Sequence, residues 1–274
     1  MIDTMENRPV VSVVTPCFNS RLYLRETMES VLSQAGPVLE YIIVDGGSTD
    51  GTLDIIKEYA ARDGRIRWIS GPDDGISDAF NKGIALARGE LIGIINSDDT
   101  YLPGALAAVA EAYRTHPECD VFNGDMLRLE GDRVLFLLKP SDLNRHIWHE
   151  MPLNHPATFV TARAYRQVGG FDKALRVAMD YDLVLRLYSR GCCFHYLERP
   201  LAAMRYGGAS DAGFMSGLRE VREVSIKAGY PIWKAYTWFA WRVVKTSSKN
   251  VLRRMGLFRL MRIHPRFRAP DGGK

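Results

Sequence analysis

The chain has 274 residues, 46% of them hydrophobic and 25% charged, which is typical of a folded globular protein. It has no apolar run of the roughly 18 residues that a spanning helix needs, so we expect no transmembrane helix. The first residues, MIDTMENRPV, lack the apolar core of a secretory signal, and we therefore expect a cytoplasmic protein.

The net charge of +4 is distributed unevenly along the chain. From Val224 to Lys274 there are 12 Lys and Arg residues and one acid, Asp271, so this segment carries a net charge of +11. The remainder holds 24 of the 36 basic residues and 31 of the 32 acidic residues, a net charge of −7. A mildly acidic body with a strongly basic tail favours contact with an anionic surface, either a membrane or a nucleic acid.

Predicted strands and helices alternate along the first part of the chain. β-branched runs predict the strands, and apolar residues at helical spacing predict the helices. In chain order we expect a strand at Val10–Thr15, a helix over Leu24–Leu32, a strand at Tyr41–Val44, a helix over Leu53–Ala61, a strand at Ile66–Ile69, a helix over Ala79–Ala87, a strand from Leu91, and a helix with Pro103 in its first turn. This alternation predicts a largely parallel sheet with right-handed crossovers.

A polar segment follows each of the four predicted strands. In order, these segments read TPCFN, DGGSTDG, GPDDG and NSDD. Ligands bind outside the carboxyl ends of the strands in such sheets, so we expect a binding site at this edge.

The alternation weakens in the second half of the chain. Leu127–Leu138 predicts a hairpin around Glu-Gly-Asp, and Asp180–Arg190 predicts a helix. The four cysteines are Cys17, Cys119, Cys192 and Cys193. Because the neighbouring pair is a poor disulfide framework, we expect free thiols in a reducing compartment. Cys192, Cys193 and His195 lack the spacing of a zinc site.

Eight short motifs carry a family resemblance. VVTPCFN, VDGGSTDGT, DDGISDAFNKGI, INSDD, NHPATF, GGFD, MDYDLVLRL and MRYGGAS occur in this order over roughly residues 10–212. The sequence therefore resembles family 2 glycosyltransferases, and most closely the exopolysaccharide and lipopolysaccharide branch. The resemblance implies a GT-A fold, which is a Rossmann-like, mostly parallel sheet flanked by helices, over residues 1–212. It also implies inverting transfer of a sugar from a nucleotide-sugar, usually with a divalent cation such as Mg²⁺ or Mn²⁺.

Two adjacent carboxylates, Asp98 and Asp99, end the fourth predicted strand. Like charges repel each other there, and burial of either one unpaired is costly, so a positive partner or a helix N-terminus is expected nearby. They resemble the DXD-type motif of the family, which implies that Asp99 binds the metal and that Asp98 contacts the ribose or an outer-shell water. Asn96 stands where many relatives have a first aspartate. The alternative is that the two aspartates cap the helix that follows.

The resemblance also places donor-binding residues in the first two polar segments. A carboxylate at Asp45 is expected to accept a hydrogen bond from a nucleotide base, with Ser48 or Asp50 serving the base or the ribose. The same pocket is expected to include residues of the first segment, namely Thr15, Pro16 and Asn19. Asp-Gly and Ser-Thr-Asp-Gly sequences are also ordinary turn chemistry, and both roles are expected together.

The segment DDGISDAFNKG adds Asp73, Asp78, Asn81 and Lys82. Asp78 and Lys82 are four residues apart, so a simple ion pair on a helix face is one explanation. The resemblance instead places Asp73 and Asp78 near the ribose and the sugar of the donor, with Asn81 and Lys82 beside them.

Asp180 is the expected catalytic base. Inverting transfer needs one carboxylate to take the proton of the acceptor hydroxyl, and a position at a helix N-terminus favours the ionised form. Met179 replaces the glutamate that many members carry, and Asp182 is the rival candidate. His155 matches a family histidine and is a possible contact to the acceptor or to phosphate. Arg205, next to Gly207–Ser210, is a possible clamp on the diphosphate, or alternatively a surface charge.

The basic segment 213–274 is expected to be an amphipathic helical tail at a membrane surface. On a helical wheel, residues 232, 236, 239, 240 and 243 share one side. The opposite side gathers Lys234, Arg242, Lys245 and Lys249, with Trp233, Trp238 and Trp241 between the two. This pattern is typical of an interfacial helix, although a helix packed on the catalytic domain is the alternative. Nucleic-acid binding is not expected, because no recognition motif accompanies the charge.

These observations predict an inverting enzyme at the cytoplasmic face of the membrane. The expected donor is a UDP-, GDP- or dTDP-sugar, and the expected acceptor is a saccharide or a lipid-linked saccharide. Two alternatives remain: an enzyme that loads a sugar onto polyprenyl phosphate, and a non-catalytic scaffold that binds sugar nucleotides.

Overall fold

The computed structural model describes residues 10–34, 39–206 and 213–254. Its strands are β1 (Val11–Cys17), β2 (Leu39–Asp45), β3 (Ile66–Ser70), β4 (Leu91–Ile94), β5 (Thr100–Tyr101), β6 (Val121–Glu130), β7 (Arg133–Leu138), β8 (Thr158–Thr161) and β9 (Phe194–Arg205). Its helices are α1 (Leu24–Leu32), α2 (Thr52–Arg62), α3 (Ile76–Leu86), α4 (Ala105–Thr115), α5 (Leu143–His146), α6 (Ala162–Val168), α7 (Met179–Ser189), α9 (Phe214–Lys227) and α10 (Ile232–Arg254), with a 3-10 turn, η2, at His155–Ala157.

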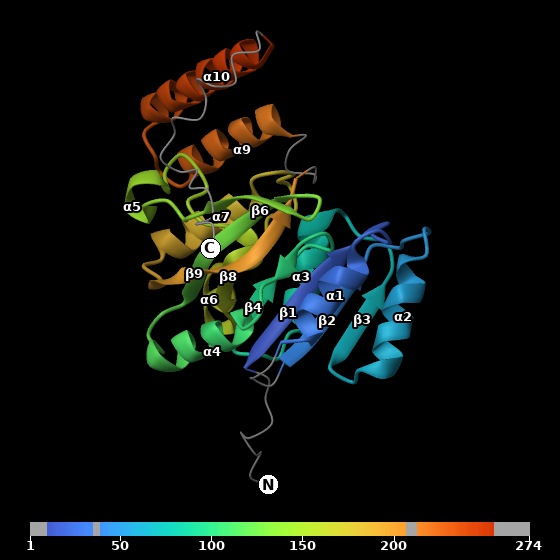
Figure 1. The fold of residues 1–274 in the computed structure, drawn as a ribbon. Helices are drawn as coiled ribbons and strands as arrows, with labels where there is room; N and C mark the ends of the chain where they lie inside the picture. The colour runs from blue at the N-terminus through green and yellow to red at the C-terminus, as the bar shows by residue number, and fades with distance from the viewer. Residues whose placement is uncertain (1–9, 35–38, 207–212, 255–274) are drawn as a thin grey trace, which may run out of the picture.

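The strands form one sheet in the order β3-β2-β1-β4-β8-β6-β9-β5, with β7 paired to β6 (Figure 1). The pairs β2–β3, β1–β2 and β1–β4 are parallel, as the alternation of strands and helices predicts. Beyond β4 the sheet is mixed, because β8 runs antiparallel to both β4 and β6, while β6 and β9 are parallel. The predicted hairpin is confirmed as β6–β7.

Helices cover both faces of the sheet, which explains why the central strands are apolar on both sides. Val13 of β1 belongs to a core cluster with Met28 of α1 and Leu106 of α4. The neighbouring Val14 belongs to the opposite cluster, which contains Phe80 of α3 and Leu183 of α7. Each side chain of this size that is fully buried stabilises the fold by about 1.5–3 kcal/mol. The result is a three-layer α/β/α arrangement.

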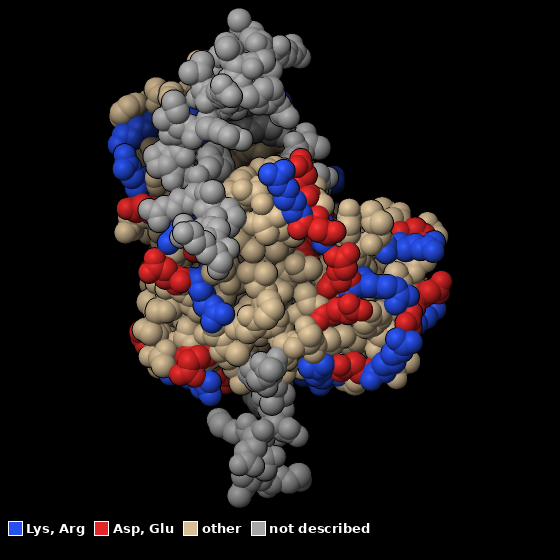
Figure 2. Space-filling view, in the orientation of Figure 1, with Lys and Arg blue, Asp and Glu red and all other residues tan. Residues whose placement is uncertain are grey.

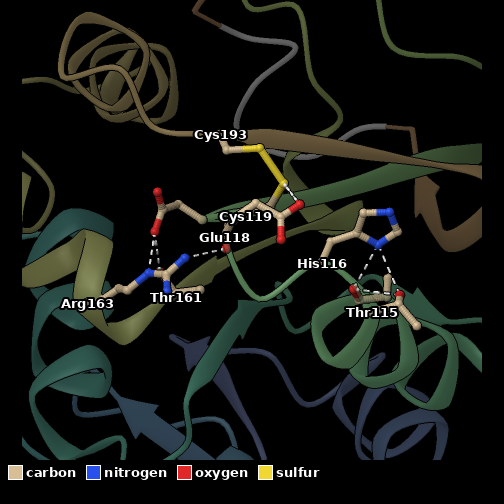
Figure 3. Close-up of a disulfide and its surroundings, with 9 residues drawn as sticks. Thr115, His116, Glu118, Cys119, Thr161, Arg163 and Cys193 are labelled. Carbon is tan, nitrogen blue, oxygen red and sulfur yellow. Dashed lines mark hydrogen bonds and ion pairs between the residues drawn. A yellow bond between two sulfur atoms is a disulfide. The ribbon is translucent and has the colours of Figure 1, made fainter.

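Two local predictions need correction. Pro103 lies before α4 and not in its first turn, because Gly104, in a left-handed conformation, precedes the first helical residue, Ala105. The prediction of free thiols is wrong for Cys119 and Cys193, which form a disulfide (Figure 3). The parallel pairing of β6 with β9 places the residues just before these strands side by side, across 74 residues of sequence. In the sequence, only the neighbouring cysteines, Cys192 and Cys193, suggested whether a disulfide could form.

The chain that follows residue 212 begins with a helix that packs on the sheet's helical layer. In α9, Leu218 and Val224 are buried, and Val224 belongs to the core cluster of α7. α10 then packs on α9, and both lie in the upper part of Figure 1, at the end of the molecule where β1 finishes. No helix among the described residues is long and apolar enough to span a membrane.

Candidate active site

The four polar segments that follow β1 to β4 meet at one edge of the sheet, as predicted. The backbone N–H of Asn19 donates to the Ser48 hydroxyl at 2.8 Å, and the Asn19 side chain accepts from the Thr49 N–H at 3.0 Å. The Ser97 hydroxyl, after β4, donates to Ser20 at 2.7 Å. Loops from three strands are therefore tied together by direct hydrogen bonds.

Asp45 ends β2 with only 1% of its surface exposed. Its carboxylate accepts hydrogen bonds from the hydroxyls of Ser48 and Ser70, the latter at 2.6 Å, and from the Gly47 N–H at 3.2 Å. The loop after β2 thus donates hydrogen bonds to the Asp45 carboxylate, and these bonds in turn order the loop. Thr15, in β1, is also buried and accepts a hydrogen bond from the Tyr41 hydroxyl at 3.1 Å.

The third polar segment meets the loop after β2 through Asp73. One oxygen of Asp73 accepts from the Gly75 N–H at 3.0 Å. The other lies against Gly46, where a Cβ atom would approach it to 2.5 Å, so only glycine fits. Phe18, beside Gly46, leaves 65% of its surface exposed. This aromatic ring is not among the predicted site residues, although its position directly after a strand, in a binding-site loop, was the available signal. Pro16, two residues earlier, is buried within β1.

Asp50 lies one residue before Gly51, the N-cap residue of α2. It accepts from the Thr52 N–H at 3.0 Å, from the Thr52 hydroxyl at 2.6 Å and from the Arg21 N–H at 3.1 Å. These bonds, first of all the one from the Thr52 hydroxyl, hold the pKa of Asp50 below its usual value. All of these hydrogen-bond donors belong to the protein, so the ionised form of Asp50 is stabilised without a bound ligand.

The predicted ion pair between Asp78 and Lys82 is confirmed at 2.9 Å. Lys173 adds a second contact to Asp78 at 3.2 Å, and these partners lower the pKa of Asp78 to about 2. Asn81 donates to the carbonyl of Phe171 at 2.9 Å and accepts from its N–H at 2.7 Å. Asn81 therefore fixes the GGFD loop, 90 residues further along the chain.

Asp99 is buried, with 1% of its surface exposed, whereas Asp98 is only half-buried. Oδ1 of Asp99 accepts from the Arg205 N–H at 3.2 Å, and Oδ2 has no hydrogen-bond partner among the described residues. Burial, followed by the charge of Asp98, raises the pKa of Asp99 to about 8, although Arg128 and Arg205 oppose the shift. Burial thus favours the protonated form of Asp99, which reduces the repulsion between the two neighbouring carboxyl groups.

Arg205 places a positive charge near the adjacent aspartates, although its guanidinium contacts neither carboxylate. Its guanidinium donates to the Asp98 carbonyl at 2.9 Å, pairs with Glu26 and lies over the ring of Tyr23 at 4.6 Å. With 8% of its surface exposed, it is not the surface charge that one alternative proposed. Neither aspartate caps α4, whose N-cap residue is Gly104, so the capping alternative is also wrong. Gly207–Ser210 lie outside the described residues.

Asp180 stands at the second position of α7 and accepts a hydrogen bond from the Tyr181 N–H at 2.7 Å. Burial raises its pKa, and the neighbouring His155 opposes this shift. The helix start favours the ionised form as expected, since the hydrogen bond from the Tyr181 N–H lowers the pKa of Asp180, but desolvation is the larger effect. The rival carboxylate, Asp182, is already paired with Arg186 at 2.8 Å.

His155 lies in η2 and packs between aromatic rings. Its ring centroid is 5.5 Å from Phe80 and 6.4 Å from Phe171. Nε2 is buried and has no partner among the described residues, and burial lowers the pKa of the imidazole while Asp180 opposes this effect. The structure thus brings together His155 and Asp180, which the sequence argument treated separately.

Two other groupings of side chains lie away from these aspartates. A cavity of about 440 Å³ on the outer side of α7 is lined by the Asp182–Arg186 pair and by α9, and not by Asp99 or Asp180. His146, His149 and Glu150 bring possible ligand atoms within 4.8 Å of one another. Arg242 of α10 donates to Glu150 at 3.4 Å, so this cluster joins α10 to the domain.

Comparisons with known proteins agree with this geometry. Residues 12–167 match the family model described as Glycosyl transferase family 2. The chain is 32% identical, over 82% of its length, to an O-antigen biosynthesis protein, RfbC, of Myxococcus xanthus, and 32% identical, over 69%, to a chondroitin synthase of Escherichia coli. It spans only 18% and 28% of these two relatives. It is also 30% identical to a PGL/p-HBAD biosynthesis glycosyltransferase of Mycobacterium bovis, over 74% of this chain and 80% of that one.

Two solved structures share the fold. TarS of S. aureus, in complex with UDP-GlcNAc, has a TM-score of 0.64 at 20% identity, over 84% of this chain and 70% of that one. The mannosyltransferase PcManGT of Pyrobaculum calidifontis, in complex with GDP-Man and Mn²⁺, has a TM-score of 0.64 at 17% identity, over 85% of this chain and 70% of that one. With the family model covering more than half of its length, this chain belongs to glycosyltransferase family 2.

Proposed function

We propose that this protein transfers a sugar from a nucleotide-sugar to a saccharide or lipid-linked acceptor, with inversion at the anomeric carbon. One observation carries the proposal. At the carboxyl edge of the sheet, Asp99 presents a buried oxygen without a hydrogen-bond partner among the described residues, and the loops that contain Asp45 and Asp73 meet at the same edge. α7 adds a further carboxylate, Asp180, whose pKa is raised.

The donor pocket is proposed to lie along the loops after β1, β2 and β3. The exposed ring of Phe18 offers a surface on which a base can stack, and the ordered loop at Asp45 offers backbone groups for its edge. The solved neighbours were crystallised with UDP-GlcNAc and with GDP-Man. A UDP-, GDP- or dTDP-sugar is therefore the proposed donor, with Asp73 and Asp98 toward the ribose and the sugar.

A divalent cation fits the residues at the end of β4. Asp99 Oδ2 and Asn96 Oδ1 are buried oxygens without hydrogen-bond partners among the described residues, and Mg²⁺ and Mn²⁺ prefer oxygen ligands. Asp99 would hold the cation, with Asp98 beside it. When bound, the cation would offset the negative charge on the departing nucleoside diphosphate. Arg205 is buried next to Asp98 and adds a fixed positive charge to the same region.

Asp180 is proposed to act as the base. The acceptor oxygen would attack the anomeric carbon from the face opposite the diphosphate, the bond to the diphosphate oxygen would break, and Asp180 would take the hydroxyl proton. A raised pKa makes the carboxylate a stronger base than an exposed aspartate. His155, next to it, favours the ionised form that the reaction needs.

The names of the relatives favour a product in surface polysaccharide synthesis, since they include an O-antigen biosynthesis protein and a chondroitin synthase. Transfer to polyprenyl phosphate is the second candidate, and a lipid phosphate acceptor offered beside a saccharide distinguishes the two. The scaffold alternative lacks support from the structure, because a scaffold does not require an aspartate with an unpaired buried oxygen.

We also propose that the enzyme works at the cytoplasmic face of a membrane, docked through α10. Five apolar or aromatic side chains of this helix leave more than half of their surface exposed, namely Ile232, Trp233, Tyr236, Trp241 and Val244. Lys234 lies over Trp233 at 5.4 Å and Lys245 over Trp241 at 4.5 Å, so cations border the aromatic face. The helix has six basic residues and no acid, which complements the anionic cytoplasmic leaflet. The Cys119–Cys193 disulfide argues against a cytoplasmic location, because disulfides are rare in reducing compartments.

The test of the proposed function is a screen of UDP-, GDP- and dTDP-sugars for thermal stabilisation, with Mn²⁺, with Mg²⁺ and with chelator. We expect one nucleotide class to raise the melting temperature of the wild type in a metal-dependent way. Asp99→Asn should lose most of this dependence, because the amide cannot supply the anionic oxygen. Asp132→Asn, an exposed aspartate in the β6–β7 turn, is the matched control. Equal stabilisation of the wild type with and without metal would exclude the cation site.

A further inference from the structure

Glu220 of α9 makes an unusual contact with the chain that leads into the catalytic helix. Its carboxylate accepts three consecutive backbone N–H groups, those of Arg176 at 3.1 Å, Val177 at 2.8 Å and Ala178 at 2.8 Å. Asp180 follows two residues later, at the start of α7. Charge-assisted bonds of this kind are about twice as strong as bonds between neutral groups.

The surface of α9 around Glu220 is shaped for this contact. A Cβ atom at Gly213 would lie 2.7 Å from Val177 Cγ2, and one at Gly217 would lie 2.9 Å from Val177 Cγ1. Glycine at these positions therefore lets α9 approach Val177 closely. Gly217 and Glu220 are three residues apart, so they lie on the same face of the helix. The close approach and the three hydrogen bonds are independent observations of the same contact. We call this contact of Glu220 with residues 176–178 the clamp.

The clamp fixes where α7 begins. No side chain caps the helix at Ala178, its N-cap residue, and the first acidic residue of the helix is Asp180 itself. The carboxylate of Glu220 binds the N–H of Ala178 and of the two residues before it, whereas Asp180 accepts the N–H of Tyr181 inside the helix. A base must lie within about 3 Å of the proton that it accepts, so a small shift of the helix start matters.

We propose that Glu220 is a positioning residue for sugar transfer, holding residues 176–178 so that the Asp180 carboxylate meets the acceptor hydroxyl. This inference rests on the proposed role of Asp180. It assigns a part of the active site to α9, which lies beyond the region matched by the family model and beyond every donor motif.

The first test measures the clamp without relying on activity. Hydrogen exchange of peptides covering residues 174–184 should be about tenfold faster or more in Glu220→Ala than in the wild type, because three backbone donors lose their acceptor. Glu223→Gln is the matched control on the same helix, since Glu223 is exposed and pairs only with its neighbour Arg222 among the described residues. Unchanged exchange in Glu220→Ala would overturn the clamp.

The second test measures transfer and donor binding together in the full-length chain. In Glu220→Ala we expect kcat to fall by up to about 10²-fold, the cost of a displacement on the order of 1 Å, while the affinity and stoichiometry of donor binding stay at wild-type values. Glu220→Gln keeps one acceptor oxygen and should retain an intermediate rate. A loss of donor stoichiometry in step with kcat would mean that Glu220 only supports folding, and a wild-type kcat would also overturn the proposal.

Asp180→Asn separates this inference from the proposed function. If Asp180→Asn retains wild-type turnover, the base is misassigned, whatever Glu220 does. If Asp180→Asn is inactive while Glu220→Ala turns over normally, the proposed function stands and the positioning role is wrong.

Discussion

At the scale of single residues, Asp98 and Asp99 pose an electrostatic problem that the structure solves in two ways. Asp99 lies in a buried site that raises its pKa to about 8, and Arg205 donates its backbone N–H to one oxygen of that carboxyl. The guanidinium of Arg205 binds the Asp98 carbonyl instead of either carboxylate. The cation proposed for this site would favour the ionised form of Asp99, so we expect its binding to be linked to deprotonation.

The raised pKa of Asp99 predicts how stability changes with pH. A carboxyl whose pKa is higher in the folded protein than in the unfolded chain stabilises the fold below the unfolded pKa, and this contribution is lost as the pH rises toward about 8. The metal-free wild type should thus lose stability from about pH 4 to 8 relative to Asp99→Asn. Urea unfolding of both proteins across this range measures the difference. Parallel pH curves for the two proteins would contradict the assignment.

Several residue roles were within reach of the sequence. The ion pair of Asp78 with Lys82 follows from their spacing, and the pairing of Asp182 with Arg186 has the same spacing. The electrostatic interaction of His155 with Asp180 was not predictable, since the two residues are 25 positions apart and only the tertiary fold brings them near each other. The burial of Arg205 likewise depends on the pairing of β9 with β6 and β5.

At the scale of elements, α10 shows why a helical wheel identifies an amphipathic helix but not its packed side. The face that meets the rest of the protein is centred on Ala235, which is 2% exposed, and it includes Arg242, which pairs with Glu150. Arg222 of α9 lies over Tyr236 at 4.7 Å and over Phe239 at 4.8 Å. These contacts use residues that the wheel assigned to opposite sides. Trp233, Trp241 and Val244 are left on the outer surface.

The outer face of α10 predicts binding to anionic vesicles. The full-length protein should sediment with vesicles of phosphatidylcholine and phosphatidylglycerol at low salt, and less so as the salt concentration rises, because the attraction is partly electrostatic. Replacing Trp233 and Trp241 by serine should abolish most of this binding. Trp68→Ser, at a half-exposed tryptophan of β3, should not change it.

Two outcomes would contradict the membrane prediction. Absence of sedimentation with anionic vesicles at low salt would exclude it directly. Concentration-dependent dimers that disappear in the Trp233 and Trp241 variant, without vesicle binding, would identify the face as a contact between two copies of the chain.

At the scale of the whole molecule, the sequence predicts half of the sheet better than the other half. β1 to β4 are joined by helices of ordinary length, so their parallel direction follows from the alternation. The mixed strands β5, β8 and β9 join residues that are distant in sequence, such as Thr100 with Ala203, and local patterns carry no information on such pairs. The disulfide and the contact of Glu220 with Ala178 also join residues that are distant in sequence, so local patterns could not predict them.

Charge is also organised over the whole molecule. In Figure 2, acidic and basic side chains lie side by side over the right part of the body, and one group of Lys and Arg lies at the upper left edge. The donor loops and α10 lie at the same end of the molecule as the carboxyl end of β1 (Figure 1). This arrangement would let a membrane-docked enzyme meet a lipid-linked acceptor without a spanning segment of its own in the described residues.

The central claim is that this family 2 protein transfers sugar with Asp180 as its base. The direct measurement compares turnover and donor binding of the wild type, Asp180→Asn and Asp182→Asn, with the nucleotide-sugar that stabilises the protein. Asp180→Asn should lose about 10²–10⁴-fold in kcat with nearly unchanged donor affinity, and Asp182→Asn should remain far more active. Near-normal turnover in Asp180→Asn, or its loss in Asp182→Asn alone, would contradict the account.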